Sequence, residues 1–75
     1  MSSREEITMK ALRVASGLTQ EQLARKLDIS VSTVRNWDAG RSFPHLSPAA
    51  MEALAAALGT DLTTLAAAER AQRNG

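Results

Sequence analysis

The sequence predicts a compact all-α domain built from five helices, without a strand. Apolar residues recur at helical spacing along the chain, and a Gly or a capping residue separates one such segment from the next. The chain has 75 residues, enough for one domain whose single core only just offsets the conformational entropy of the chain. We therefore expect residues 1–75 to form one domain that ends in a polar tail over about residues 69–75.

The first helix is expected from about Arg4 to Ser16. It presents Met9, Leu12 and Ser16 at positions i, i+3 and i+7, which lie on one face of a helix. Gly17 follows directly and is a residue preferred just past a helix end.

The second helix is expected over about residues 19–27. Thr19 followed three residues later by Gln22 has the spacing of a capping box. The helix dipole favours an acidic residue in the first turn, where Glu21 lies. The apolar positions of this segment form one buried face: Leu23, Ala24 and Leu27.

The third helix is expected over residues 31–39, with Ser30 as its N-cap and Gly40 as its stop signal. Helical periodicity places Val34 and Trp37 together on one side. We expect this side to lie in the core, because a lone Trp three residues after Val packs more often than it stacks on a base. The opposite side carries Ser32, Arg35, Asn36 and Ala39.

Two further helices complete the expected fold. Ser47 and Pro48 form an N-cap and first-turn pair, and Gly59 ends the helix that they begin. Its apolar stripe consists of Met51, Leu54, Ala55 and Leu58. Asp61 can cap a fifth helix, which begins with Leu62 and Leu65 and continues through residues 66–68.

Residues 19–40 form a motif of two short helices joined by a tight turn, which is typical of a unit that holds a helix against a DNA groove. Short side chains that donate and accept hydrogen bonds can read base edges, and Asn36 can pair with an adenine edge. Arg35 can reach a guanine or a phosphate. The hydroxyl residues near the helix start can bond to phosphates or bases, where the helix dipole also favours anions: Ser30, Ser32 and Thr33.

These residues also have a purely structural interpretation. Ser30 caps helices in proteins that never meet DNA, and any exposed helix face in water is polar. Taken singly, none of these signals separates a DNA-reading helix from an ordinary surface helix.

A larger set of residues at fixed spacing favours the DNA-binding interpretation over that of an ordinary surface helix. The segments are Leu12-Arg13, GLTQEQLA over residues 17–24, ISVSTVRNWDAGR over residues 29–41, and residues 57–59 with Leu62 and Leu65. Over about residues 9–65 the chain resembles the phage repressor and Cro class of helix-turn-helix domains, also called the xenobiotic-response-element family. The resemblance implies a lambda-repressor-like fold in which the helix over residues 19–27 lies across the DNA backbone and the helix over residues 31–39 enters the major groove.

The resemblance also implies roles for single positions. Val31, Ser32 and Asn36 fall where the family reads bases, and Val31 can touch a thymine methyl. Gln20 falls where the family contacts a phosphate and braces the recognition helix, and Arg41 falls in a stretch that often meets the backbone. The side-chain chemistry and the resemblance together predict two groups of DNA-contacting residues. The expected base-reading residues are Val31, Ser32, Arg35 and Asn36. The expected phosphate contacts are Gln20, Ser30, Thr33 and Arg41.

Two further positions match a basic and an acidic residue that pair in the family. The resemblance implies that Arg13 and Asp38 tie the first helix to the recognition helix, so that these residues, like Trp37, are structural. A buried pair adds little net stability, but losing one partner leaves the other charge unpaired.

The chain departs from the family pattern in three places. Asp28 stands where the family commonly has Gly, at a left-handed backbone position that Asp tolerates. The connection over residues 41–48 is about two residues longer than common family members have. Val31 and Ser32 are shorter than the Gln, Arg or Lys of many members, so discrimination is expected to be modest or to depend on DNA shape.

The net charge of only +1 implies few phosphate contacts per subunit, and therefore modest affinity and a shallow salt dependence. We therefore expect two subunits to bind together. The fifth helix carries more apolar surface than a terminal element needs, and by the resemblance it helps to form a homodimer on a palindromic operator.

The sequence gives no support for an enzyme, a metal site or a cofactor. It has no Cys and one His, and His45 has no acid, second His or Cys at a useful spacing. Phe43 in the same loop is expected to fill the core. No apolar run approaches a membrane span and no secretory signal is recognisable, so a cytoplasmic location without membrane contact is expected.

Two functions therefore stay open. The first is a regulator that binds double-stranded DNA sequence-specifically, most often a repressor in this family. The second is a protein-interaction module, such as an antitoxin that binds a toxin and represses its own operon, or a domain that has kept the fold and lost base reading.

Overall fold

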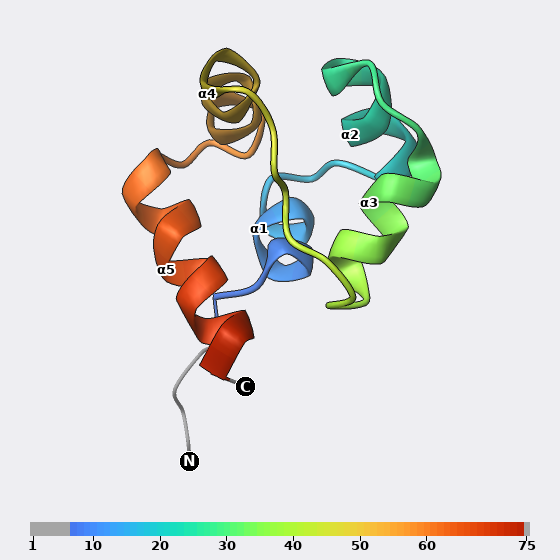
Figure 1. The fold of residues 1–75 in the computed structure, drawn as a ribbon. Helices are drawn as coiled ribbons and strands as arrows, with labels where there is room; N and C mark the ends of the chain where they lie inside the picture. The colour runs from blue at the N-terminus through green and yellow to red at the C-terminus, as the bar shows by residue number, and fades with distance from the viewer. Residues whose placement is uncertain (1–6, 75) are drawn as a thin grey trace.

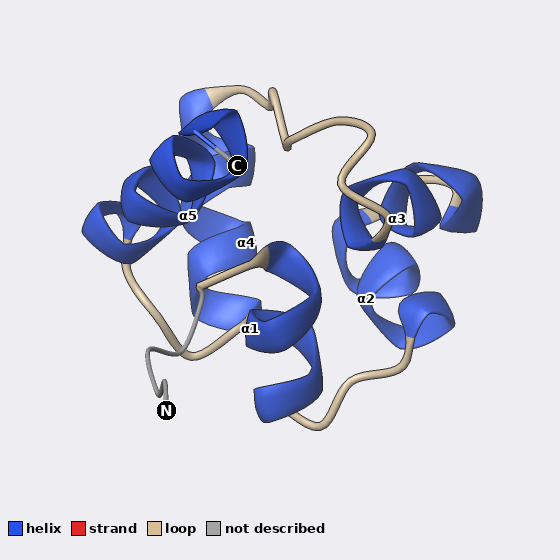
Figure 2. Ribbon diagram, turned by 90° about the horizontal axis from the view of Figure 1, so that it is seen from below, coloured by secondary structure: helices blue, strands red, loops and turns tan. Residues whose placement is uncertain are grey.

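The computed structural model describes residues 7–74. Within that range the chain forms α1 (Met9–Ala15), α2 (Gln20–Leu27), α3 (Val31–Asp38), α4 (Pro48–Ala57) and α5 (Leu62–Asn74), and no strand. α1 lies in the middle, with α2 and α3 on one side of it and α4 and α5 on the other (Figures 1 and 2). This arrangement confirms the prediction of a compact all-α fold of five helices.

The core is apolar and receives side chains from every helix and from the loop between α3 and α4. Val34 and Trp37 of α3 are 0% and 3% exposed, which confirms that this side of the helix faces inward. Phe43 is buried as well and joins the α3–α4 loop to the core. The other buried apolar residues are Met9, Leu23, Ala24, Leu54, Ala55, Leu58, Leu65 and Ala68.

α1 begins later than expected. The segment from Arg4 to residue 6 lies outside the described residues, but Ile7 and Thr8 precede the helix. Thr8 Oγ1 accepts a hydrogen bond of 3.0 Å from the backbone N–H of Ala11, so Thr8 is the N-cap. The expectation of a helical segment running through residues 7 and 8 is therefore wrong, because a capping threonine stops it from extending backwards.

α5 is longer than the segment expected from its apolar residues. Asp61 Oδ1 accepts a hydrogen bond of 2.8 Å from the backbone N–H of Thr64, as expected of a cap. The helix then continues to Asn74, so most of the polar tail is helical. A 2.8 Å ion pair between Arg73 and Glu69, one turn apart, supports this last part.

Asp28 adopts the left-handed conformation that the resemblance implies, with φ of 58° and ψ of 47°. It ends α2, and the backbone N–H of Ile29 then donates to the carbonyl oxygen of Ala24 at 3.0 Å. This bond turns the chain sharply toward α3. Among the described residues other than Gly, Asp28 alone has a positive φ.

Candidate nucleic-acid interface

α3 presents a polar stripe on the side opposite its buried residues. Ser32, Arg35 and Asn36 are exposed, and they are spaced i, i+3 and i+4 along one face. Val31 and Thr33 border this stripe and are partly buried, with Val31 also packing against the core. The stripe therefore combines hydroxyl, amide and guanidinium groups on a helix whose other face is fixed.

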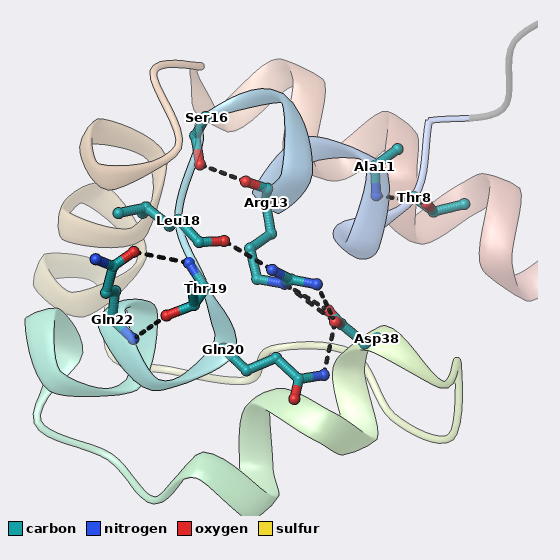
Figure 3. A network of polar contacts seen from close by, with 9 residues as sticks. All are labelled: Thr8, Ala11, Arg13, Ser16, Leu18, Thr19, Gln20, Gln22 and Asp38. Atoms are coloured by element: carbon teal, nitrogen blue, oxygen red, sulfur yellow. Dashed lines mark hydrogen bonds and ion pairs between the residues drawn. The ribbon is translucent and has the colours of Figure 1, made fainter.

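The C-terminal end of α3 is held by a polar network (Figure 3). Arg13 of α1 donates from Nη2 to Asp38 Oδ2 at 2.7 Å and from Nε to the same carboxylate at 3.0 and 3.3 Å. Its Nη1 donates to the carbonyl oxygen of Leu18 at 2.7 Å. The Arg13 and Asp38 side chains are only 11% and 8% exposed, so this two-pronged pair lies largely away from water.

Gln20 joins the same network from the start of α2. Its Nε2 donates to Asp38 Oδ2 at 2.9 Å, so three helices meet at one carboxylate (Figure 3). The resemblance implies that Gln20 braces α3, and this hydrogen bond is a direct contact between the two. An amide nitrogen carries two hydrogens, and one of them makes this bond with Asp38.

The start of α2 is fixed by a reciprocal cap. Thr19 Oγ1 accepts from the backbone N–H of Gln22 at 3.0 Å, and Gln22 Oε1 accepts from the backbone N–H of Thr19 at 2.9 Å. This is the capping box predicted from the spacing of the two residues. The cap fixes the first turn of α2, which includes Gln20.

The start of α3 carries two hydroxyls in contact with each other. Ser30 Oγ accepts from the backbone N–H of Thr33 at 3.3 Å and lies 3.0 Å from Thr33 Oγ1. One hydroxyl hydrogen suffices for the contact between the two oxygens. The other hydroxyl hydrogen therefore stays available to an acceptor at the positive end of the helix.

The end of α3 contains a contact that sequence reasoning did not anticipate. Gly40, with φ of +77°, reverses the chain, and the backbone N–H of Arg41 donates to the carbonyl oxygen of Asn36 at 3.0 Å. Arg41 Nη1 also donates to Asn36 Oδ1 at 3.4 Å. The Gly following an expected helix end was the available signal, because this type of helix ending brings the residue after Gly back beside the third-last residue of the helix.

A second unanticipated contact comes from α5. Gln72 Nε2 donates to the carbonyl oxygen of Gly40 at 3.3 Å, which links the last turn of α5 to the glycine that follows the C-cap of α3. Nothing in the local sequence pattern pairs Gln72 with Gly40, which lie 32 positions apart.

His45, in the loop between α3 and α4, is exposed, as expected.

Comparison with known families gives a consistent result. A family model described as a helix-turn-helix domain matches residues 7–68, which is most of the chain and includes all of α2 and α3. No curated protein and no solved structure matches the chain. Within the described residues, no helix is both long and apolar enough to cross a membrane. The match over residues 7–68 means that the chain belongs to the helix-turn-helix domain family.

Proposed function

We propose that this protein is a transcriptional regulator of the phage repressor and Cro class, which binds double-stranded DNA sequence-specifically and acts as a repressor. The observation that carries the proposal is the exposed stripe of Ser32, Arg35 and Asn36 on a helix whose position is set by the buried Trp37 and by the ion pair at Asp38. A rigidly held helix with small polar groups outward is what major-groove reading requires.

In this proposal α3 lies in the major groove. Asn36 reads a base edge through its amide, Arg35 donates to a guanine or to a nearby phosphate, and Ser32 bonds to a base at the start of the helix. Val31 supplies an apolar contact for a thymine methyl group. These side chains are short apart from Arg35, so each subunit reads only a few base pairs.

The backbone contacts come from the edges of the motif. Gln20 has a second amide hydrogen, and Ser30 and Thr33 share a spare hydroxyl hydrogen, at the ends of helices where the dipole favours a phosphate. Arg41 is exposed beside the end of α3 and adds a positive charge. Only Arg41 and Arg35 in this set are cationic, so each subunit neutralises about one or two phosphates and the salt slope is about −1 to −2 per subunit.

So few ionic contacts favour binding as a homodimer. Two subunits related by a twofold axis would place their copies of α3 about 34 Å apart, one turn of DNA, on a palindromic site. A dimer seated on a promoter blocks access to it, which is the simplest route to repression.

The test is selection of binding sites from a random duplex library, followed by fluorescence anisotropy titrations at two salt concentrations. The proposal expects a palindromic consensus, preferred over a scrambled duplex by about 10³-fold or more, and a salt slope for the dimer of about −2 to −4. A protein that selects no consensus, binds duplexes weakly and equally, and forms a stoichiometric complex with another protein would overturn it in favour of the interaction-module interpretation.

A further inference from the structure

Arg41 and Asn36 are joined by two hydrogen bonds, one through the backbone and one through the side chains. The backbone N–H of Arg41 lies 3.0 Å from the carbonyl oxygen of Asn36, and Arg41 Nη1 lies 3.4 Å from Asn36 Oδ1. Both side chains are exposed. The proposed phosphate-binding residue is therefore in direct contact with the proposed base-reading residue.

The backbone that carries Arg41 is fixed from two directions. The left-handed Gly40 and the bond from the Gly40 N–H to the carbonyl oxygen of Trp37, at 3.1 Å, close the end of α3. Gln72 of α5 donates to the carbonyl oxygen of Gly40 at 3.3 Å. The Arg41 side chain thus starts from a defined position instead of from a free loop.

The chemistry of the two groups gives the contact a role. An asparagine amide can present its oxygen and nitrogen in two orientations related by a flip, and only one of them matches a given base edge. A guanidinium beside Oδ1 favours the orientation with Oδ1 toward Arg41 and the Nδ2 group away from it. Because a guanidinium has five N–H donors, Arg41 can hold Asn36 and still donate to a phosphate.

We propose that Arg41 is a positioning residue for Asn36, so that it sets discrimination at the base pair that Asn36 reads in addition to contacting the backbone. This inference rests on the proposed function, because it concerns the same DNA-binding surface. It differs from a plain phosphate contact in one measurable respect: a plain phosphate contact weakens binding to all sequences by the same factor when it is removed.

The experiment is a double-mutant cycle with Arg41→Ala, Asn36→Ala and both together, titrated against the selected operator and every single-base-pair variant of it. Arg25→Ala is the matched control, since Arg25 is an exposed arginine on α2 outside the proposed contact set. Arg41→Lys is added because a lysine keeps the charge but lacks the fork that serves two acceptors. Side-chain amide signals of Asn36 in the free proteins are followed by NMR, alongside circular dichroism for folding.

We expect Asn36→Ala to abolish a preference of about 5- to 150-fold at one base pair. Arg41→Ala is expected to lower that same preference by a factor of about two or more, the coupling expected of contacting residues, and to have no further effect on it once Asn36 is Ala. Arg41→Lys should recover overall affinity without recovering the preference, and Arg41→Ala should shift the Asn36 side-chain signals.

Two failures are distinguishable. If the wild-type domain selects a consensus but Arg41→Ala lowers affinity for all duplexes by one common factor, and leaves the Asn36 signals in place, the inference is wrong while the proposed function stands. If the wild-type domain shows no sequence preference, both are wrong. An equal loss of preference in Arg25→Ala would also overturn the inference, because the effect would then follow from charge alone.

Discussion

α3 is contacted at its C-terminal end by two regions that differ in burial. On one side, Arg13 and Gln20 converge on Asp38 through contacts of 2.7 to 3.3 Å, with the charged side chains about nine-tenths buried. On the other side, α5 reaches Gly40 through one exposed hydrogen bond of 3.3 Å from Gln72. The buried contacts act on Asp38 inside the helix and fix its direction, while the exposed contact acts only on Gly40, beyond the helix end.

The largest expected effect tests the buried side. Asp38→Ala leaves the Arg13 guanidinium without its carboxylate and Gln20 without its acceptor, and stranding one partner of a buried pair costs about 3–5 kcal/mol. A chain of this length has a total free energy of unfolding of about 4–11 kcal/mol. Urea unfolding should therefore show a large fall in stability.

Glu52→Ala is the control, since Glu52 is exposed on α4 and has no ion pair among those found in the described residues. Its removal should change stability by less than about 0.5 kcal/mol. Equal thermal midpoints for Asp38→Ala and Glu52→Ala would contradict the structural role of the network. The double variant Arg13→Met with Asp38→Leu should recover much of the loss, because apolar residues can replace a buried pair.

The next effect concerns the outward face, which should matter for DNA and not for folding. Asn36→Ala removes no buried contact, so its unfolding free energy should stay within about 0.5 kcal/mol of wild type. Discrimination at one base pair should fall by about 1–3 kcal/mol. Titration against single-base-pair variants of a selected site measures this, and a uniform loss over all sequences would instead assign Asn36 to the DNA backbone.

A smaller effect of opposite sign is expected in the turn between α2 and α3. Asp28 is exposed and left-handed, with φ of 58°, which costs an L-residue about 1–2 kcal/mol. Gly accepts this conformation freely but loses more chain entropy on folding, by about 0.5–1 kcal/mol. Asp28→Gly should therefore raise the free energy of unfolding by about 0.5 kcal/mol, measured by urea titration, and a clear loss would mean that the Asp side chain stabilises the turn.

The α5 side should respond least. Removing the exposed Gln72 contact by Gln72→Ala should lower stability by no more than about 0.5 kcal/mol, seen as a shift in thermal midpoint of a few degrees at most. A loss as large as that of Asp38→Ala would mean that both regions fix α3 equally, contrary to their difference in burial.

The cap of α5 gives a prediction in pH. The backbone N–H and hydroxyl of Thr64 hold the pKa of the Asp61 carboxyl below its usual 3.8. Because the folded pKa is the lower one, the stabilisation is complete above pH 3.8 and is lost as pH falls through the folded value. Thermal midpoints of wild type and Asp61→Asn should converge as the pH is lowered below 3.8, and a constant difference would mean that the charge of Asp61 does not stabilise the fold, because Asn keeps the uncharged cap.

The sequence was most informative where one residue type has one structural use. Val34 and Trp37, three positions apart, could only share a face, and Gly40 and the Thr19–Gln22 spacing marked helix ends correctly. The pairing of Arg13 with Asp38 was expected from the resemblance alone, because no local rule joins two residues 25 positions apart.

The start of α1 and the end of α5 were predicted wrongly, although the sequence contains signals for both. Thr8 is a capping residue, but the first helix was expected to begin before it, at about Arg4. Glu69 and Arg73 have the one-turn spacing of a stabilising pair, yet their polarity suggested a tail. The contacts of Arg41 with Asn36 and of Gln72 with Gly40 depend on how the loop after α3 closes, which follows from packing between distant helices.

The central claim is that the outward face of α3 meets the DNA bases. The most direct test is NMR chemical-shift mapping of the whole chain with its selected duplex and with a scrambled duplex of the same length. We expect signals of residues 30–41, including the Asn36 side chain, to move in a sequence-dependent way while those of α4 stay in place. If residues 30–41 do not respond and another surface does, the claim is contradicted.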